Sequence, residues 1–447
     1  MKIILNSLLA VSLLLLTACG SGPTIVEPPV PSPTPESPPV SPGQPQARLV
    51  SSELTRQVIQ EMDETELAEL VNGNSRFAFD LYQALRAEEG NLFYSPYSIS
   101  LALAMTYAGA RGETESQMAE ALHFDLPQAS LHAAYNALDQ TLAARGQIEN
   151  NEETEETFRL NIVNSLWGQE GYSFLPEYLD LLALNYGAGL TLVDFMQDPE
   201  AARQLINDWV NEQTEGRIDE LIPQGAIEVL TRLVLVNAIY FNAQWAYQFE
   251  QAQTGPGPFY LLDSSQVSTP MMNQTEIFPY ARLDGYQALE MPYKGHELSM
   301  VVLLPDQERF EEFEAGFSLD TLQTTLASLS PHNLDLNFPK FEFDASFQLA
   351  DTLDGMGMHD AFIEGVADFS GMDGTRDLLI TDVIHKAFVS VAEEGTEAAA
   401  ATGVVVGVTS MPPEPVEVKV DRPFIFLIRD IETGAILFMG RVTNPGA

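Results

Sequence analysis

Cysteine is almost absent from this chain, because Cys19 is the only one among 447 residues. A single thiol near the N-terminus excludes a disulfide framework, a cysteine-based metal site and a cysteine nucleophile in the folded part. Basic residues are also scarce, with 21 Lys and Arg against 64 Asp and Glu and a formal net charge of −43. Such a surface repels phosphate backbones and sulfated polyanions, so we expect neither nucleic acid nor heparin as a partner.

Motifs for catalysis and for metal binding are missing as well. His296 and Glu297 begin like a zinc-protease motif without its second histidine, and the pair Gly355 and Gly357 lacks the third glycine of a nucleotide loop. No nucleophile elbow of the form GxSxG occurs. None of the six histidines has a partner at helical metal-ligand spacing: His123, His132, His296, His332, His359 and His385. The sequence therefore predicts no metal, no cofactor and no enzyme.

The N-terminal residues have the pattern of a secretory signal peptide. Lys2 precedes a mostly apolar stretch from Ile3 to Leu16, which is too short to cross a bilayer comfortably and is built like a secretory signal. It ends in Ala18 and Cys19, and a small residue before cysteine resembles the lipobox of bacterial lipoproteins. We expect residues 1–18 to be a lipoprotein signal peptide and Cys19 to carry a lipid that anchors the protein to a bacterial membrane, outside the cytoplasm. The alternative is an ordinary signal peptide followed by an accidental cysteine.

Residues 19–47 then form a linker dominated by Pro, Ser and Gly. This composition favours extended polyproline II, which at about 3.1 Å per residue would span up to ~80 Å. From residue 48 to residue 447 we find no second linker and no internal repeat, and 45% of the chain is hydrophobic. The sequence therefore predicts one large globular domain over 48–447, and we expect it to be a monomer.

The segment after Val391 differs from an ordinary core strand. Read with the two-residue period of a strand, one face is small or apolar throughout: Thr396, Ala398, Ala400, Thr402, Val404, Val406 and Val408. Consecutive alanines and the glycines at 403 and 407 disfavour a permanent strand, and Pro412 and Pro413 follow. Small side chains suit a segment that must slide between two existing strands. The alternative is a permanent buried strand followed by a proline turn.

This segment resembles the hinge and reactive-centre loop of inhibitory serpins. Further resemblances occur in family order between Phe77 and Pro445: Asn91 to Ser98, Leu101 to Gly112, Ile206 to Ile218, Val236 to Trp245, Asp421 to Phe424, Leu437 to Val442, and Asn444 with Pro445. The resemblance implies an α+β fold, the serpin fold, with three β-sheets, about eight or nine helices and an exposed reactive-centre loop.

The resemblance also implies three groups of site residues. The hinge comprises Glu393, Gly395, Thr396, Glu397, Ala398, Ala399, Ala400 and Ala401. The shutter, a polar cluster under the centre of the main sheet, comprises Ser95, Ser98, Asn237 and His385. The breach, where the loop enters the sheet, comprises Trp245 and Lys340. Lys340 and Glu393 match a pair that ties the loop base to a neighbouring strand, and we expect a surface contact of about 0 to 1 kcal/mol.

The mechanism implied is suicide inhibition, in which a protease cuts the loop and is trapped as an acyl-enzyme when the loop inserts into the main sheet. Hinge spacing from Gly395 predicts a reactive bond between Thr409 and Ser410, although counting back from Pro423 gives a different position. Cleavage after Met411 is disfavoured by Pro412. A small uncharged residue after valines favours an elastase-like or subtilisin-like serine protease, with a cysteine protease as the second candidate class.

Two other functions remain open at this stage. A non-inhibitory serpin would act as a surface binding or structural protein, and bulky or charged hinge residues would favour it; Thr396 and the alanines do not. An enzyme is disfavoured by the missing motifs. The acidic stretch from Glu149 to Glu156 is expected to be a solvated loop.

Overall fold

The structure is a computed structural model that describes residues 47–59, 63–145, 147–150, 153–156, 158–396 and 414–446, with the backbone alone for 147–161 and for residue 240. The expected signal peptide, Cys19 and nearly all of the linker lie outside the described residues, and so do residues 397–413, where the reactive-centre loop is expected.

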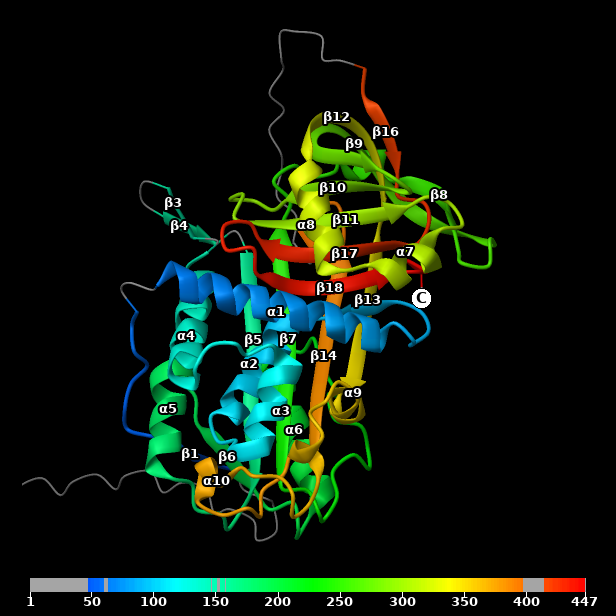
Figure 1. The fold of residues 1–447 in the computed structure, drawn as a ribbon. Coiled ribbons are helices and arrows are strands. Elements are labelled where there is room, and N and C mark those ends of the chain that lie inside the picture. The colour runs from blue at the N-terminus through cyan, green and yellow to red at the C-terminus, as the bar shows by residue number, and fades with distance from the viewer. Residues whose placement is uncertain are drawn as a thin grey trace, which may run out of the picture. The chain divides into compact units, whose positions relative to one another are not determined.

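A seven-stranded sheet forms the centre of the domain, in the order β1-β6-β5-β7-β15-β14-β13. Figure 1 shows its long strands β5, β7 and β14 running side by side. The strands are β1 (Arg48–Val50), β5 (Phe158–Gln169), β6 (Leu190–Val193), β7 (Leu233–Gln244), β13 (Phe341–Gln348), β14 (Asp382–Val391) and β15 (Gly395–Thr396). The apolar runs in β7 and β14 match strands that are covered on both faces.

A nine-stranded sheet has the order β16-β12-β9-β10-β11-β17-β18-β2, with β8 paired to β9. Its strands are β2 (Leu92–Tyr94), β8 (Gly255–Tyr260), β9 (Gln266–Leu283), β10 (Tyr286–Pro292), β11 (Leu298–Pro305), β12 (Ser330–Pro339), β16 (Val416–Lys419), β17 (Phe424–Asp430) and β18 (Ile436–Val442). The apolar strand β11 is buried along its whole length, as expected of a central strand.

A third sheet is a two-stranded hairpin of β3 (Gln147–Asn150) and β4 (Glu153–Glu156). It lies in the acidic stretch that we expected to be a loop, so that expectation was wrong. Acidic and amide side chains are poor strand formers, and the pattern therefore pointed away from a strand. Pairing of the two backbones decides the conformation here, rather than side-chain preference.

The described residues contain ten α-helices, and the expected α+β serpin fold with three sheets is confirmed. They are α1 (Glu64–Leu85), α2 (Pro96–Tyr107), α3 (Gly112–Leu122), α4 (Gln128–Ala144), α5 (Pro176–Tyr186), α6 (Pro199–Gln213), α7 (Phe310–Gly316), α8 (Leu319–Ser328), α9 (Ala350–Gly355) and α10 (Ser370–Asp373). The last two have 6 and 4 residues, too few to show a helical period in the sequence. Within these ranges, no helix is both long and apolar enough to cross a membrane.

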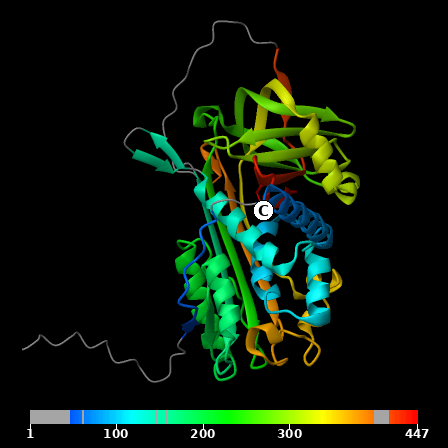
Figure 2. The ribbon, with the colours of Figure 1, turned by 60° about the vertical axis from the view of Figure 1, so that its left-hand side comes forward.

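Helices cover both faces of the seven-stranded sheet (Figure 1, Figure 2). Helix α2 packs on one face, in the larger apolar core, and α6 packs on the other, in a second core shared with β5, β7 and β14. Two helix starts follow local sequence rules: Ser95 caps α2 ahead of Pro96, and Asp198 caps α6 ahead of Pro199. The sheet is therefore a covered layer, and anything that enters it must displace packed side chains.

Candidate functional site at the seam between two parallel strands

The candidate site is the line along which β7 and β14 pair, which we call the seam. The two strands run parallel, in register from Val234 opposite Asp382 to residue 240 opposite Phe388. Beyond that point they separate, and β15 lies between them, antiparallel to both. An antiparallel strand thus already occupies one end of a parallel pair, and the rest of the seam is closed.

The two expected hinge residues that form β15 are held tightly in this position. Thr396 lies opposite Ala243 of β7 and Val391 of β14, is 1% exposed, and its hydroxyl lies 2.8 Å from that of Tyr293. Gly395 has a φ of +156°, and a Cβ on it would lie 2.0 Å from the carbonyl oxygen of Ala243. Only glycine allows the backbones to approach so closely.

Trp245 lies where the chain enters the seam. Its indole N–H donates to the carbonyl of Ala392 at 3.0 Å, and its backbone N–H donates to the carbonyl of Glu394 at 2.9 Å. The ring stacks on Tyr293 with 4.6 Å between centroids and is 2% exposed. This tryptophan therefore fixes the turn that leads from β14 into β15.

Lys340 and Glu393 also meet at the base of the loop, with 2.6 Å between Nζ and Oε2. The Thr254 hydroxyl donates to the other carboxylate oxygen at 2.7 Å. Burial opposes ionisation of Glu393, but these hydrogen bonds outweigh it and lower its pKa. The pair was expected at the surface, which is wrong for Glu393, since its side chain is only 5% exposed. Removing the partner of a buried, hydrogen-bonded carboxylate costs more than breaking a surface pair, because the charge is then left buried without compensation.

The four expected shutter residues lie together under the middle of the seam. The Ser95 hydroxyl caps α2, accepts from the Ser98 N–H and donates to the carbonyl of Leu437 at 2.6 Å. The Ser98 hydroxyl donates to Asn164 Oδ1 at 3.2 Å and accepts from the amide of Asn237. Asn237 also donates to Asn164, so one polar cluster joins α2 to the adjacent strands β5 and β7.

His385 completes this cluster across the seam. Its Nε2 accepts from the Ser95 N–H at 3.1 Å, so its Nδ1 carries the proton and donates to Asn237 Oδ1. The two residues lie directly opposite each other on β14 and β7. Complete burial of His385 lowers its pKa to about 3, so the ring is neutral. Separating the strands would break the His385–Asn237 bond between two fully buried residues and leave polar groups of both without a partner.

Comparison with known proteins decides the family. The family model described as "Serpin (serine protease inhibitor)" matches residues 72–445. The chain belongs to the serpin family.

Relatives of this serpin span most of its length. A protein of Thermococcus kodakarensis called an uncharacterised serpin-like protein is 43% identical to it over 378 residues. This alignment covers 84% of this chain and 86% of the relative. It is 40% identical over 392 residues to the human leukocyte elastase inhibitor, covering 85% of this chain and all of the relative.

Solved serpin structures have the same fold. The thermophilic serpin tengpin in its native state matches with a TM-score of 0.77 and 28% identity, covering 89% of this chain and 100% of that one. Uncleaved ovalbumin matches with a TM-score of 0.74 and 28% identity, covering 84% of this chain and 100% of that one.

Three residues of this site in the serpin were not predicted: Asn164, Tyr293 and Thr254. Asn164 is a polar residue inside an apolar strand sequence, and that signal could have drawn attention to it. Tyr293 and Thr254 lie on other elements and gave no local signal. The hinge residues Glu397 to Ala401 and the expected reactive bond from Thr409 to Ser410 lie outside the described residues. Among the side chains described, no cluster of His, Cys, Asp and Glu could hold a metal ion.

Proposed function

We propose that this serpin inhibits serine proteases by inserting its cleaved loop into the seam between β7 and β14. The observation that carries this proposal is β15, which places Gly395 and Thr396 between the two strands in antiparallel register with both. Continued insertion would replace one parallel ladder with two antiparallel ladders. Each added hydrogen bond contributes about 1 kcal/mol, so a long insertion yields a large driving force.

The register of β15 supports a specific inserted arrangement. Thr396 lies opposite Ala243 and Val391, and continuing this register by six residues would bring Thr402 opposite both Asn237 and His385. Insertion separates these two shutter residues, whose hydrogen bond would otherwise be lost in a buried site. The Thr402 hydroxyl can donate to one of them and accept from the other. The loop would thus bring a replacement for the bond it breaks.

In the proposed reaction, the protease serine oxygen attacks the carbonyl carbon of Thr409. The peptide bond to Ser410 breaks, an ester to the protease forms, and Ser410 leaves as a new amino terminus with the proton supplied by the protease. The freed hinge then inserts before water can hydrolyse the ester. The target class we propose is elastase-like or subtilisin-like, because Thr409 is small and uncharged and relatives are named leukocyte elastase inhibitors.

The first test is to mix the protein with an elastase-like and a subtilisin-like protease and analyse the products on a denaturing gel. We expect a complex that survives detergent, with cleavage after Thr409 determined by mass spectrometry. Cleavage elsewhere would contradict the proposed reactive bond. Cleavage without a stable complex would favour the alternative, a non-inhibitory surface protein.

Thr396→Arg is the matched variant for this experiment. Thr396 is 1% exposed between two strands, and a buried guanidinium without a partner is costly enough to block entry of the hinge. We expect the variant to be cut at the same bond at a similar rate but to form no stable complex. Retention of the complex would contradict insertion through this end of the seam.

We also propose that Cys19 carries a lipid that holds the protein at a bacterial membrane, outside the cytoplasm. Its support is the short apolar segment that ends in Ala18 and Cys19. Cys19→Ser should move the protein from the membrane fraction to the soluble fraction and remove the mass of the lipid. An unchanged mass and distribution would contradict the anchor.

A further inference from the structure

The seam is covered by α6 and by the segment that follows it, residues 214–232. Together we call them the α6 cover. Their buried apolar side chains are Ala202, Ile206, Val210, Ile218, Leu221, Ile222 and Ile227, and they form one core with Val236 of β7 and Ile384 of β14. Val236 and Ile384 are direct partners across the seam. The α6 cover therefore packs on both strands that an inserting strand would have to separate.

Glu220 in the segment 214–232 is held from two sides. Its backbone carbonyl accepts from Lys386 Nζ of β14 at 3.1 Å, which fastens the segment to the far side of the seam. Its carboxylate pairs with Arg203 of α6, with 2.7 Å between Oε1 and Nη1. Glu220 thus links α6 to the strand across the seam.

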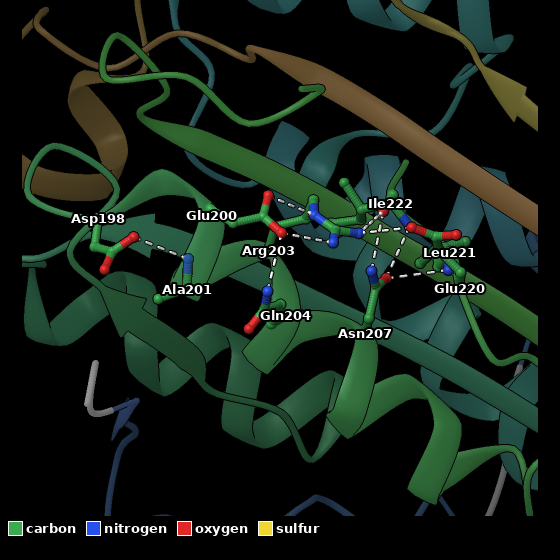
Figure 3. A network of polar contacts seen from close by, with 9 residues as sticks. All are labelled: Asp198, Glu200, Ala201, Arg203, Gln204, Asn207, Glu220, Leu221 and Ile222. Carbon is green, nitrogen blue, oxygen red and sulfur yellow. Dashed lines mark hydrogen bonds and ion pairs between the residues drawn. The ribbon is translucent and has the colours of Figure 1, made fainter. Parts of the chain in front are cut away.

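Arg203 is the centre of the polar contacts drawn in Figure 3. Its guanidinium, 11% exposed, binds both carboxylate oxygens of Glu200 on its own helix. It also donates to Glu220 and to the carbonyl of Ile222, at 2.7 Å each, and both belong to the following segment. One turn further along α6, Asn207 accepts from the N–H groups of Leu221 and Ile222 and donates to the Ile222 carbonyl.

From these contacts we propose that Arg203 and Asn207 join the two parts of the α6 cover into one body and so slow the entry of a strand into the seam. This inference rests on the proposed function. We call the contacts of Arg203 and Asn207 with residues 220–222 the clip. While the clip holds, α6 and the segment 214–232 must leave the seam together, and their apolar contacts are lost in one step. When the clip is cut, the segment can leave first, and the barrier to entry is lower.

The test measures strand entry without a protease. A synthetic peptide with the sequence of residues 396–409 is incubated with the full protein, and incorporation is followed by native gel and by the rise of the thermal-unfolding midpoint. Arg203→Met removes the ion pair and the bond to Ile222, and we expect incorporation about tenfold faster. Glu220→Gln removes only the exposed ion pair, and we expect incorporation of the peptide about threefold faster than in wild type.

Glu200→Gln is the matched control, because it weakens the ion pair of Arg203 within α6 and leaves the contacts of Arg203 with the segment 214–232 intact. We expect its incorporation rate to stay within twofold of wild type. Equal rates in wild type, Arg203→Met and Glu220→Gln would overturn the clip, and an equal acceleration in Glu200→Gln would show general destabilisation instead. If wild type takes up no peptide, the proposed insertion itself fails.

Discussion

At His385 one proton decides whether the shutter holds together. The neutral ring accepts from the Ser95 N–H and donates to Asn237, so protonation would place two donors face to face at Ser95. Burial lowers the pKa of His385 to about 3, and that of His132, in another part of the core, to about 4. In the unfolded chain both would titrate near 6.5.

Stability should therefore fall as the pH drops below about 6.5. Between pH 6.5 and the folded-state pKa, the unfolded state binds more protons than the folded state, so unfolding becomes easier as pH decreases. Each histidine contributes about 1.4 kcal/mol per pH unit in this window. In His385→Gln, whose amide can also accept and donate, we expect the loss between pH 7 and pH 5 to be smaller by about 2 kcal/mol.

Denaturant unfolding of both proteins at pH 7 and pH 5 measures this difference. The interval from pH 8 to pH 7 provides the control, because a histidine that titrates near 6.5 in the unfolded chain binds few protons there, so both proteins should change alike. An identical loss in wild type and His385→Gln would mean that the shutter histidine is not the group that responds.

At the scale of elements, the short strand β15 lies at the end of the seam where β7 and β14 are already separated. Its place depends on Gly395, where a Cβ would collide with the carbonyl oxygen of Ala243 at 2.0 Å. The backbone of β7 cannot move away freely, because it is paired with β5 along eleven residues, from 233 to 243. A larger side chain at position 395 could therefore be accommodated only if β15 moved away from β7.

We expect Gly395→Ala to expel β15 from the end of the seam. The collision and the positive φ both oppose alanine, and a cost above about 2 kcal/mol is typical of such sites. Hydrogen exchange at the amides of residues 243–245 and 395–396 should accelerate at least tenfold, and inhibition should weaken. Gly434→Ala is the control, because its φ is also positive but a Cβ there meets no atom within 4 Å. Unchanged exchange in Gly395→Ala would contradict the tight seating of the hinge.

At the scale of the whole molecule, the net charge of −43 acts on stability and on partners alike. Repulsion among 64 carboxylates opposes the compact state, and the effect reaches about 10 Å at 0.1 M salt. The same field favours approach by proteases with a basic surface around their active site.

Raising sodium chloride from 20 mM to 300 mM should therefore raise the midpoint of thermal unfolding by several degrees. Differential scanning calorimetry at pH 7.5 measures this shift, and sucrose at matched osmolality provides the control for effects that are not ionic. A midpoint that falls with salt would show that local ion pairs outweigh the general repulsion.

The sequence predicted the family and the fold class, because blocks such as Asn91 to Ser98 and Asp421 to Phe424 stand in serpin order. It also named Ser95, which lies in one of these blocks, and His385, which the resemblance implies, and the structure brings the two within hydrogen-bond distance of each other. It could not assign the β3–β4 hairpin, whose acidic residues have no strand preference. Partners such as Thr254, 139 residues from Glu393, carry no local signal at all.

By itself, the sequence determined the composition of the hinge, the scarcity of cationic groups and the order of the family blocks, since these are properties of the chain. Only the tertiary structure decided that β15 lies between β7 and β14, that Glu393 is buried, and that Arg203 joins α6 to the segment covering the seam. The physical reason is that strand register, burial and ion pairing depend on contacts between residues far apart in the chain. Such contacts exist only once the strands and helices have packed together.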